Sequence, residues 1–263
     1  METFGEITVE VDTANHVALV EIHRPPNNFF SLEMLASLAD AFDAVDANNG
    51  ARCIVLAGEG KNFCAGAEFK AKDPQLTSAR STKSDRHIYD EAFRLFSCKT
   101  PSVAAVVGAA IGGGLGLACM PDFRVGGPGS RFSANFAQLG FHHGFGLSAS
   151  LPAIVGNQVA LDLLYTGRRI NGARAAEIGL IDRYVDNDDD IRAAATELAA
   201  EIASSAPLAI LSIRETMRGH LPAAIRAATD REKAEQDRLT GTADWKEGVR
   251  AMGERRPPKF IGS

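Results

Sequence analysis

The sequence predicts an α/β protein that ends in an all-helical region. Up to about Ala206, short apolar runs typical of buried strands alternate with amphipathic helical stretches, and from Pro207 onward no convincing strand pattern occurs. Strands and helices that alternate in this way indicate parallel strands joined by right-handed crossovers. We therefore predict two regions, with residues 1–205 forming an α/β core and residues 206–263 forming a helical appendage.

The first elements of the core are a predicted β-hairpin and a helix. Residues 7–11 and 17–22 alternate apolar and polar side chains, and residues 12–15 supply the turn between them. A Pro-Pro pair at residues 25–26 then ends the second strand. Residues 31–48 repeat apolar side chains at helical spacing, and the serine that opens this segment is the predicted N-cap.

The remaining predicted elements continue the alternation and then become helical throughout. Residues 53–57 and 103–111 are apolar and predict two buried strands, separated by an amphipathic helix at 85–97. Shorter strands are predicted at 123–125 and 181–185. Glycine and proline residues divide the C-terminal region into three predicted helices at 208–217, 221–239 and 243–252.

Composition narrows the class of protein. The 263 residues are 45% hydrophobic, so the chain can bury a full core, and 28 Lys and Arg against 33 Asp and Glu give a net charge of −5. This charge balance does not predict a basic surface for binding nucleic acid.

The cysteines and the start of the chain indicate the compartment. The four cysteines are far apart in the sequence, and we expect them to be buried free thiols in a reducing compartment; they are Cys53, Cys64, Cys98 and Cys119. No metal site is expected. The start of the chain has no basic or apolar leader and no run of 18 apolar residues follows, so we expect a cytoplasmic protein without a membrane partner.

Two glycine-bearing turns are the most informative motifs. Residues 63–70 (Phe-Cys-Ala-Gly-Ala-Glu-Phe-Lys) follow the predicted strand at 53–57, and residues 112–116 (Gly-Gly-Gly-Leu-Gly) follow the one at 103–111. Small residues at these points let a backbone N–H face a bound group without a side chain in the way. Two such groups directed at one oxygen form an oxyanion hole, which stabilises negative charge as it develops.

A dinucleotide site is the main alternative for the glycines, and the spacing argues against it. Gly112, Gly114 and Leu117 break the G-x-G-x-x-G pattern. Gly144, Gly146 and Ala149 satisfy a G-x-G-x-x-A pattern, but the Phe-His-His sequence before them is a poor strand end.

Taken together, the ordered motifs resemble those of the crotonase (enoyl-CoA hydratase/isomerase) superfamily, over nearly the whole chain. The segments that carry the resemblance are residues 63–70, 105–114, 131–133, 139–140, 165–168, 173–182, 247–249 and 258–260. The resemblance implies a crotonase-like spiral of ββα units, with the coenzyme A and acyl pocket in residues 1–205. It also implies that residues 206–263 form a C-terminal all-helical trimerisation region, which builds a homotrimer or a dimer of trimers.

The resemblance also implies the site residues. The backbone N–H groups of Ala67 and Gly113 would hold the thioester carbonyl and stabilise its enolate. Coenzyme A would be part of an acyl-CoA substrate rather than a prosthetic group. The residues implied to contact it are Arg24, Cys64, Ala65, Gly66, Ala67, Lys70 and Gly113, with Lys259 and Phe260 contributed by a neighbouring subunit.

The chain departs from the family pattern at the two glutamates that hydratases use to move protons. The matching positions are Gly116 and Phe136, and no Asp or Glu lies between Asp122 and Asp162. Simple hydration of a 2-enoyl thioester has therefore lost both its acid/base groups. His142 and His143 are the remaining candidates for proton transfer, since an imidazole titrates near neutrality. The alternative is that neither histidine is catalytic, and that one faces solvent while the other packs on Phe141 or Phe145.

Three functions are compatible with these residues. The first is an acyl-CoA enzyme of the enoyl-CoA hydratase/isomerase type that stabilises a thioester enolate. The second is a thioesterase or decarboxylase on the same scaffold, with a histidine that positions water. The third is a non-catalytic CoA-binding protein. Phenylalanines around the expected acyl pocket favour an apolar acyl group over a charged one; they are Phe132, Phe136, Phe141 and Phe145.

Overall fold

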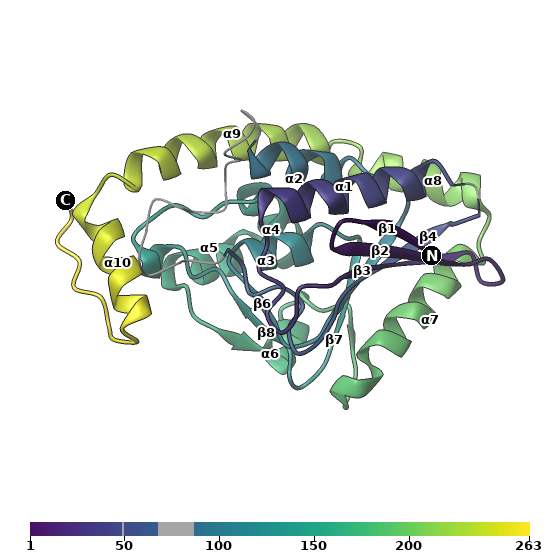
Figure 1. The fold of residues 1–263 in the computed structure, drawn as a ribbon, viewed down its shortest axis with the longest axis horizontal. Coiled ribbons are helices and arrows are strands. Elements are labelled where there is room, and N and C mark those ends of the chain that lie inside the picture. Colours follow the sequence, from purple (N-terminus) through teal and green to yellow (C-terminus); the bar gives the residue numbers. More distant parts are fainter. Residues whose placement is uncertain (49, 68–86) are drawn as a thin grey trace.

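The structure is a computed structural model that describes residues 1–48, 50–67 and 87–263. Within these ranges seven strands form the larger sheet, in the order β1-β2-β3-β4-β5-β7-β10. Figure 1 shows this sheet across the middle of the molecule. Its strands are β1 (Glu2–Phe4), β2 (Ile7–Asp12), β3 (Val17–Ile22), β4 (Cys53–Gly58), β5 (Ser102–Val106), β7 (Phe123–Gly126) and β10 (Arg183–Tyr184).

Pairing within the larger sheet changes from antiparallel to parallel at β3. Strand β2 pairs antiparallel with β1 and with β3, whereas β3-β4, β4-β5, β5-β7 and β7-β10 are all parallel. The predicted hairpin and the predicted parallel core are thus confirmed. The short first strand, β1, was not predicted.

The prediction of one strand over residues 103–111 was wrong. Strand β5 ends at Val106, and β6 (Ala109–Ile111) belongs to a second sheet with β8 (Arg131–Ser133) and β9 (Ile170–Asn171), in the order β6-β8-β9. The chain turns at Gly108, which has a φ of +62°, and the Asn62 side chain accepts a hydrogen bond from the Ala109 N–H at 2.9 Å. The apolar run hides this turn because buried residues lie on both sides of it.

Helices cover both faces of the larger sheet. Figure 1 shows α1, α2 and α9 side by side on one face and α7 alone on the other. Two separate clusters of buried apolar residues lie on these two faces. The α-helices are α1 (Leu32–Asp46), α2 (Ile88–Phe96), α3 (Gly113–Cys119), α4 (Leu147–Val155), α5 (Asn157–Thr166), α6 (Gly172–Glu177), α7 (Ile191–Ala203), α8 (Pro207–Arg218), α9 (Leu221–Leu239) and α10 (Ala243–Gly253). Two 3₁₀ turns, η1 (Ala137–Leu139) and η2 (Asp188–Asp190), complete the described secondary structure.

The first two helices begin at side-chain caps. Ser31 accepts a hydrogen bond from the Met34 N–H at 3.2 Å, as predicted for this N-cap. His87 caps α2 by accepting from the Tyr89 N–H at 3.2 Å. The first two residues of the helix predicted at 85–97 lie outside the described residues. These caps fix where α1 and α2 start, and so fix how both helices lie over the sheet.

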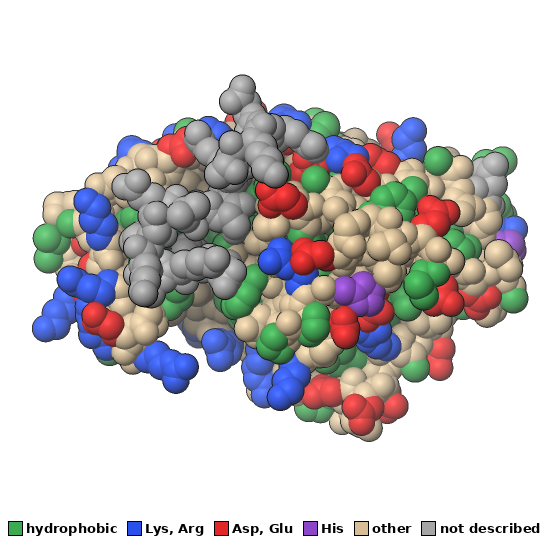
Figure 2. Space-filling model, in the orientation of Figure 1, with side chains coloured by type: hydrophobic (Ala, Val, Ile, Leu, Met, Phe, Trp, Pro, Cys, Tyr) green, Lys and Arg blue, Asp and Glu red, His purple; other side chains and the backbone are tan. Residues whose placement is uncertain are grey.

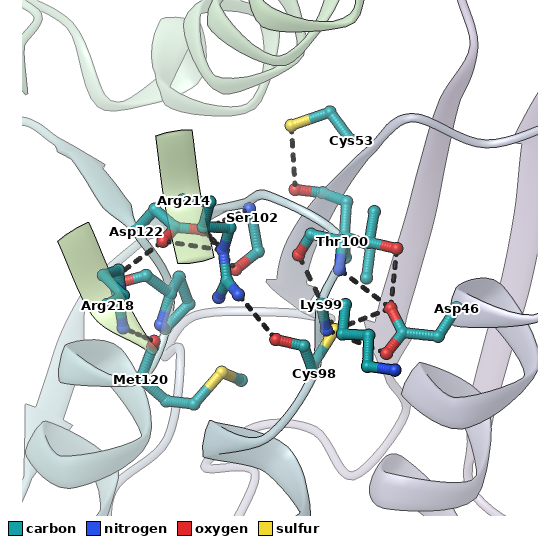
Figure 3. A network of polar contacts seen from close by, with 12 residues as sticks. Asp46, Cys53, Cys98, Lys99, Thr100, Ser102, Met120, Asp122, Arg214 and Arg218 are labelled. Carbon is teal, nitrogen blue, oxygen red and sulfur yellow. Dashed lines mark hydrogen bonds and ion pairs between the residues drawn. The ribbon is translucent and has the colours of Figure 1, made fainter. Parts of the chain in front are cut away.

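A buried carboxylate attaches the C-terminal helices to the core (Figure 3). Asp122 follows α3 and accepts hydrogen bonds from Arg214 Nε and from the Ser102 N–H, at 3.0 and 2.8 Å. Arg218 Nη1 lies 2.9 Å from the same carboxylate, and its Nη2 donates to the Met120 carbonyl. Because both arginines come from α8, this single aspartate sets how α8 lies against the sheet.

Within the described ranges, no single helix has both the length and the apolar content of a membrane span. The segments Asp188–Ala203 and Pro207–Arg218 reach that threshold only when taken together, and they meet at a bend of 105°.

We expect Asp122→Asn to lower the free energy of unfolding by about 3 kcal/mol. The change keeps the side-chain volume but leaves two mostly buried guanidinium groups without their counter-charge. Chemical denaturation at a fixed protein concentration measures the effect. Asp162→Asn, which breaks the exposed ion pair with Arg168, is the matched control and should cost less than about 1 kcal/mol. Equal losses in the two variants would contradict the anchoring role.

Candidate active site

The two predicted turns meet at one large cavity of about 990 Å3. Ala65, Gly66 and Ala67 line it from the first turn, and Gly112 and Gly113 from the second. The start of α2, the region around η1, and the helices α9 and α10 supply its other walls. Segments that are far apart in the sequence therefore enclose one chamber, and both glycine turns open into it.

Backbone pairing holds the two turns side by side. Cys64 forms a parallel bridge with Ala110: its N–H donates to the Ala109 carbonyl at 2.9 Å, and its carbonyl accepts from the Ile111 N–H at 3.1 Å. A side chain at Gly114 would overlap the Cys64 carbonyl oxygen, so only glycine allows this approach. The Cys64 thiol is fully buried, and burial raises its pKa to about 12, so it stays protonated and serves as packing.

The residues of two backbone amides, Ala67 and Gly113, line the cavity from these turns. Neither the Ala67 N–H nor the Gly113 N–H donates a hydrogen bond to another residue in the described part of the chain. A Cβ placed on Gly66 would lie 3.9 Å from Gly113 N, which shows how close the turns come at this point. Two free donors from adjacent turns are the arrangement needed to bind a carbonyl oxygen and to stabilise it as an oxyanion.

Gly116 and Phe136, which the sequence resemblance matched to hydratase glutamates, have closed or apolar surroundings. A Cβ at Gly116 would lie 2.7 Å from Phe145 Cβ, so the Phe145 side chain occupies the space that a longer residue would need. Phe136 lines the cavity and packs against Phe141 with the ring planes tilted by 57° and the centroids 5.5 Å apart. Phe141 packs against Trp245 at the same tilt of 57°, with the centroids 4.4 Å apart. Aromatic rings, rather than acidic side chains, therefore form this wall of the cavity.

A hydrogen-bonded pair supports the cavity wall beneath Gly144. Tyr89 Oη donates to Gln236 Oε1 at 2.7 Å, and Gln236 Nε2 donates to the His142 carbonyl at 2.8 Å. A side chain at Gly144 would overlap Tyr89 Oη. Burial raises the pKa of Tyr89, so its hydroxyl stays a proton donor in this pair. The pair links α2 to α9 and fixes the loop that carries the two histidines.

The structure brings His142 and His143 together but places neither among the described residues that line the cavity. Their rings stack at 4.1 Å, and His143 Nε2 lies 2.8 Å from Ser148 Oγ. Burial, with a smaller contribution from His142, lowers the pKa of His143 to about 4. His143 is therefore uncharged at neutral pH. A part for either histidine in proton transfer stays a prediction.

Glu232 binds the end of the loop that carries His142 and His143. It is fully buried, and its carboxylate accepts hydrogen bonds from the N–H groups of Gly146 and Ser148, at 2.8 and 2.9 Å. Burial raises the pKa of Glu232 despite these hydrogen bonds. This α9 residue fixes the start of α4, which directly follows Phe145 and Gly146.

Of the other predicted coenzyme contacts, those that the structure describes do not line the cavity. Arg24 donates to Ser31 Oγ at 3.2 Å and pairs with Glu6 at 3.3 Å. Lys259 and Phe260 are on the exposed C-terminal tail, where the Lys259 N–H donates to Glu247. Lys70 lies outside the described residues. The contacts of these residues with coenzyme A stay predictions.

Sequence reasoning missed several polar residues of the cavity. Asn135, Arg169, Tyr89 and Gln236 all line it. Arg169 directly follows a segment that carried the family resemblance, and Asn135 directly precedes Phe136, so both lay beside residues that had been considered. Nothing in the sequence showed that they face the same space as the glycine turns.

Comparisons with known proteins show which family the chain belongs to. The model of the enoyl-CoA hydratase/isomerase family matches residues 12–263. The chain belongs to this family. A relative from Mycobacterium tuberculosis, enoyl-CoA hydratase EchA19, is 32% identical over 258 residues that cover 95% of each chain.

Solved structures of the family have the same fold. An enoyl-CoA hydratase/isomerase from Pseudoalteromonas atlantica T6c has a TM-score of 0.86 at 29% identity, covering 97% of this chain and 100% of its own. EchA1_1 from Mycobacterium paratuberculosis has a TM-score of 0.84 at 28% identity, covering 98% of this chain and 99% of its own. The predicted crotonase fold is thus confirmed, and the protein is an enzyme of the enoyl-CoA hydratase/isomerase type.

We expect acid to destabilise the wild-type protein more than His143→Gln. The folded pKa of His143 is below that of an unfolded histidine, so its contribution is fully present above about pH 6.5 and is lost as pH falls towards 4. For this pKa difference, the loss at pH 5 relative to pH 8 is about 2 kcal/mol.

Denaturation curves of both proteins at pH 8 and pH 5 measure this difference. His220→Gln removes an exposed histidine and serves as the control, which should keep the wild-type pH dependence. If His143→Gln also keeps it, His143 does not titrate at the expected low pH.

Proposed function

We propose that the protein binds an acyl-CoA thioester and stabilises the enolate of its acyl group. The observation that supports the proposal is a pair of amides without a hydrogen-bond acceptor in the described residues, Ala67 N–H and Gly113 N–H, whose residues line one cavity from adjacent turns. Donors fixed in place before the reaction stabilise negative charge on the thioester oxygen without reorganising. Removing one such donor typically costs about 3 kcal/mol of transition-state stabilisation.

The same cavity argues against hydration by a pair of glutamates. Gly116 has no room for a longer side chain because Phe145 packs on it, and Phe136 presents a ring to the cavity. The reaction must therefore form its enolate with little help from a side-chain carboxylate at these positions.

Decarboxylation is the second candidate function, and the missing acid/base groups favour it. When the bond between the α-carbon and a carboxylate breaks, the electron pair moves into the thioester enolate and CO2 leaves. A proton from water then completes the product. These reaction steps need an oxyanion hole but no base. No comparable observation favours a thioesterase or a binding-only protein.

The proposal also includes the contacts with coenzyme A and an assembly of several copies of the chain. Figure 2 shows Lys and Arg side chains at the end of the molecule that holds α10 and the C-terminus. There Lys259 and Phe260 would contact the coenzyme of a neighbouring subunit, and Arg24 and the backbone of residues 64–67 would contact it within one chain. Helix α8 has no buried residue, and its exposed apolar side chains fit a homotrimer or a dimer of trimers; they are Leu208, Leu211, Ile213 and Met217.

A matched pair of ligands tests the oxyanion hole without changing the protein. Butyryl-CoA and S-butyl-CoA differ in the carbonyl oxygen that the two amides would bind. We expect butyryl-CoA to bind at least tenfold more tightly in isothermal titration, because two hydrogen bonds contribute about 1 kcal/mol each. Equal affinities would show that the amides do not hold the thioester oxygen.

A gain-of-function variant tests the assignment of Phe136. In deuterated water, we expect Phe136→Glu to exchange the α-protons of butyryl-CoA at least tenfold faster than wild type. A carboxylate in the cavity can act as a base next to the stabilised enolate. Mass spectrometry of the recovered thioester measures the deuterium.

Phe136→Gln is the uncharged control for this experiment. Equal rates in the Glu and Gln variants would remove Phe136 from the position of the missing base. The same assay on wild type, with 2-enoyl, 3-enoyl and dicarboxylic thioesters, tests the reaction itself. Shifted double bonds, added water, lost CO2 or released CoA each identify a reaction class.

A further inference from the structure

The cavity contains a positively charged side chain, Arg169, that the proposed function does not use. Of the described residues that line the cavity, Arg169 is the one Lys or Arg. It makes no hydrogen bond or ion pair within the described residues, whereas its neighbour Arg168 pairs with Asp162. The cavity carboxylate, Asp237, pairs with Lys233 at 3.0 Å, so its charge is already compensated. Arg169 therefore presents an uncompensated positive charge to the chamber.

The smaller sheet places Arg169 at a defined point. Strand β6 pairs with β8 so that Ile111 lies opposite Ser133, and β8 pairs with β9 so that Phe132 lies opposite Ile170. One further step of this antiparallel register brings Arg169 opposite Ser133. Arg169 and Ile111 are thus separated by two strand spacings, about 10 Å. Ile111 is two residues before Gly113, so an arginine side chain can approach the acyl group of a bound thioester.

The coenzyme is expected on the opposite side. Residues 64–67, which the coenzyme would follow, lie along one edge of β6 through the Cys64–Ala110 bridge. Strands β8 and β9, with Arg169, lie along the other edge. A positive charge on this side faces the acyl group rather than the coenzyme phosphates.

A second polar side chain lies between Arg169 and the second turn. Asn135 lines the cavity, and its Oδ1 is 3.4 Å from the position of a Cβ on Gly112. Gly167, two residues before Arg169, would place a Cβ 3.1 Å from Asn135 Cα, so the two segments are in contact. The Asn135 amide can donate a hydrogen bond to an anion without adding a negative charge of its own.

We propose that Arg169 binds a carboxylate on the acyl group, so that the substrate class is the mono-thioester of a short dicarboxylic acid. A guanidinium binds a carboxylate through two parallel hydrogen bonds, and Asn135 supplies a third donor nearby. The wall of Phe136, Phe141 and Trp245 packs on the carbon chain between the two ends. This inference rests on the proposed function, and it replaces the expectation of a purely apolar acyl group.

The test compares two ligands of equal chain length. Glutaryl-CoA and valeryl-CoA both carry five-carbon acyl chains, and they differ in a terminal carboxylate against a methyl group. We expect wild type to bind glutaryl-CoA about tenfold more tightly in isothermal titration at physiological ionic strength, because a charge-assisted pair forms at a partly solvated site. Arg169→Gln should lose this preference and keep its affinity for valeryl-CoA, and Arg169→Lys should retain part of the preference.

Arg168→Gln is the matched control, since it removes an adjacent exposed arginine that does not line the cavity. This control should keep the full preference. If wild type binds the two ligands equally, or if Arg169→Gln weakens both by the same factor, the assignment of Arg169 is wrong while the proposed function stands. If neither thioester binds to wild type, both proposals fail.

Discussion

The candidate site depends on one backbone contact, the approach of the Cys64 carbonyl to the start of α3. The Cys64–Ala110 bridge brings the turn after β4 against β6, and Gly114 leaves room for the carbonyl oxygen. Without this contact, Ala67 N–H and Gly113 N–H would belong to unrelated loops. Since both amides come from the main chain, their direction is set by the fold and tolerates changes in the surrounding side chains. The side chains around the proposed oxyanion hole can therefore vary while the two amides keep their positions.

The rest of the cavity is built around that contact by elements from distant parts of the chain. The turn at Gly108 takes β6 out of the larger sheet, and β8 and β9 then extend the second sheet on its far side. Helix α9 closes the opposite wall through Gln236, which bonds to Tyr89 and to the histidine loop, and through Glu232, which holds the loop amides. The helices at the end of the chain thus shape the cavity as well as offering an exposed face on α8.

What this chain lacks is as informative as what it shares with its family. Phe145 packs on Gly116, and Phe136 packs on Phe141, so aromatic rings surround the two positions that the sequence resemblance matched to hydratase glutamates. The same cavity is also lined by Arg169, which is exposed to solvent. In the proposal above, Arg169 selects the acyl group through a charge-assisted hydrogen bond.

The sequence by itself determined the hairpin, the parallel core, the three C-terminal helices and the family, because periodicity, caps and glycine turns are local features of the chain. It also showed that Gly116 and Phe136 cannot move protons. The tertiary structure decided what local patterns do not encode: the apolar run 103–111 divides between two sheets, and His142 and His143 lie outside the lining of the cavity. It also decided that Asn135 and Arg169 face the same space as the turns. These outcomes depend on which segments become neighbours, and that is set by long-range pairing of β6 with Cys64 and β8 rather than by any residue's own preference.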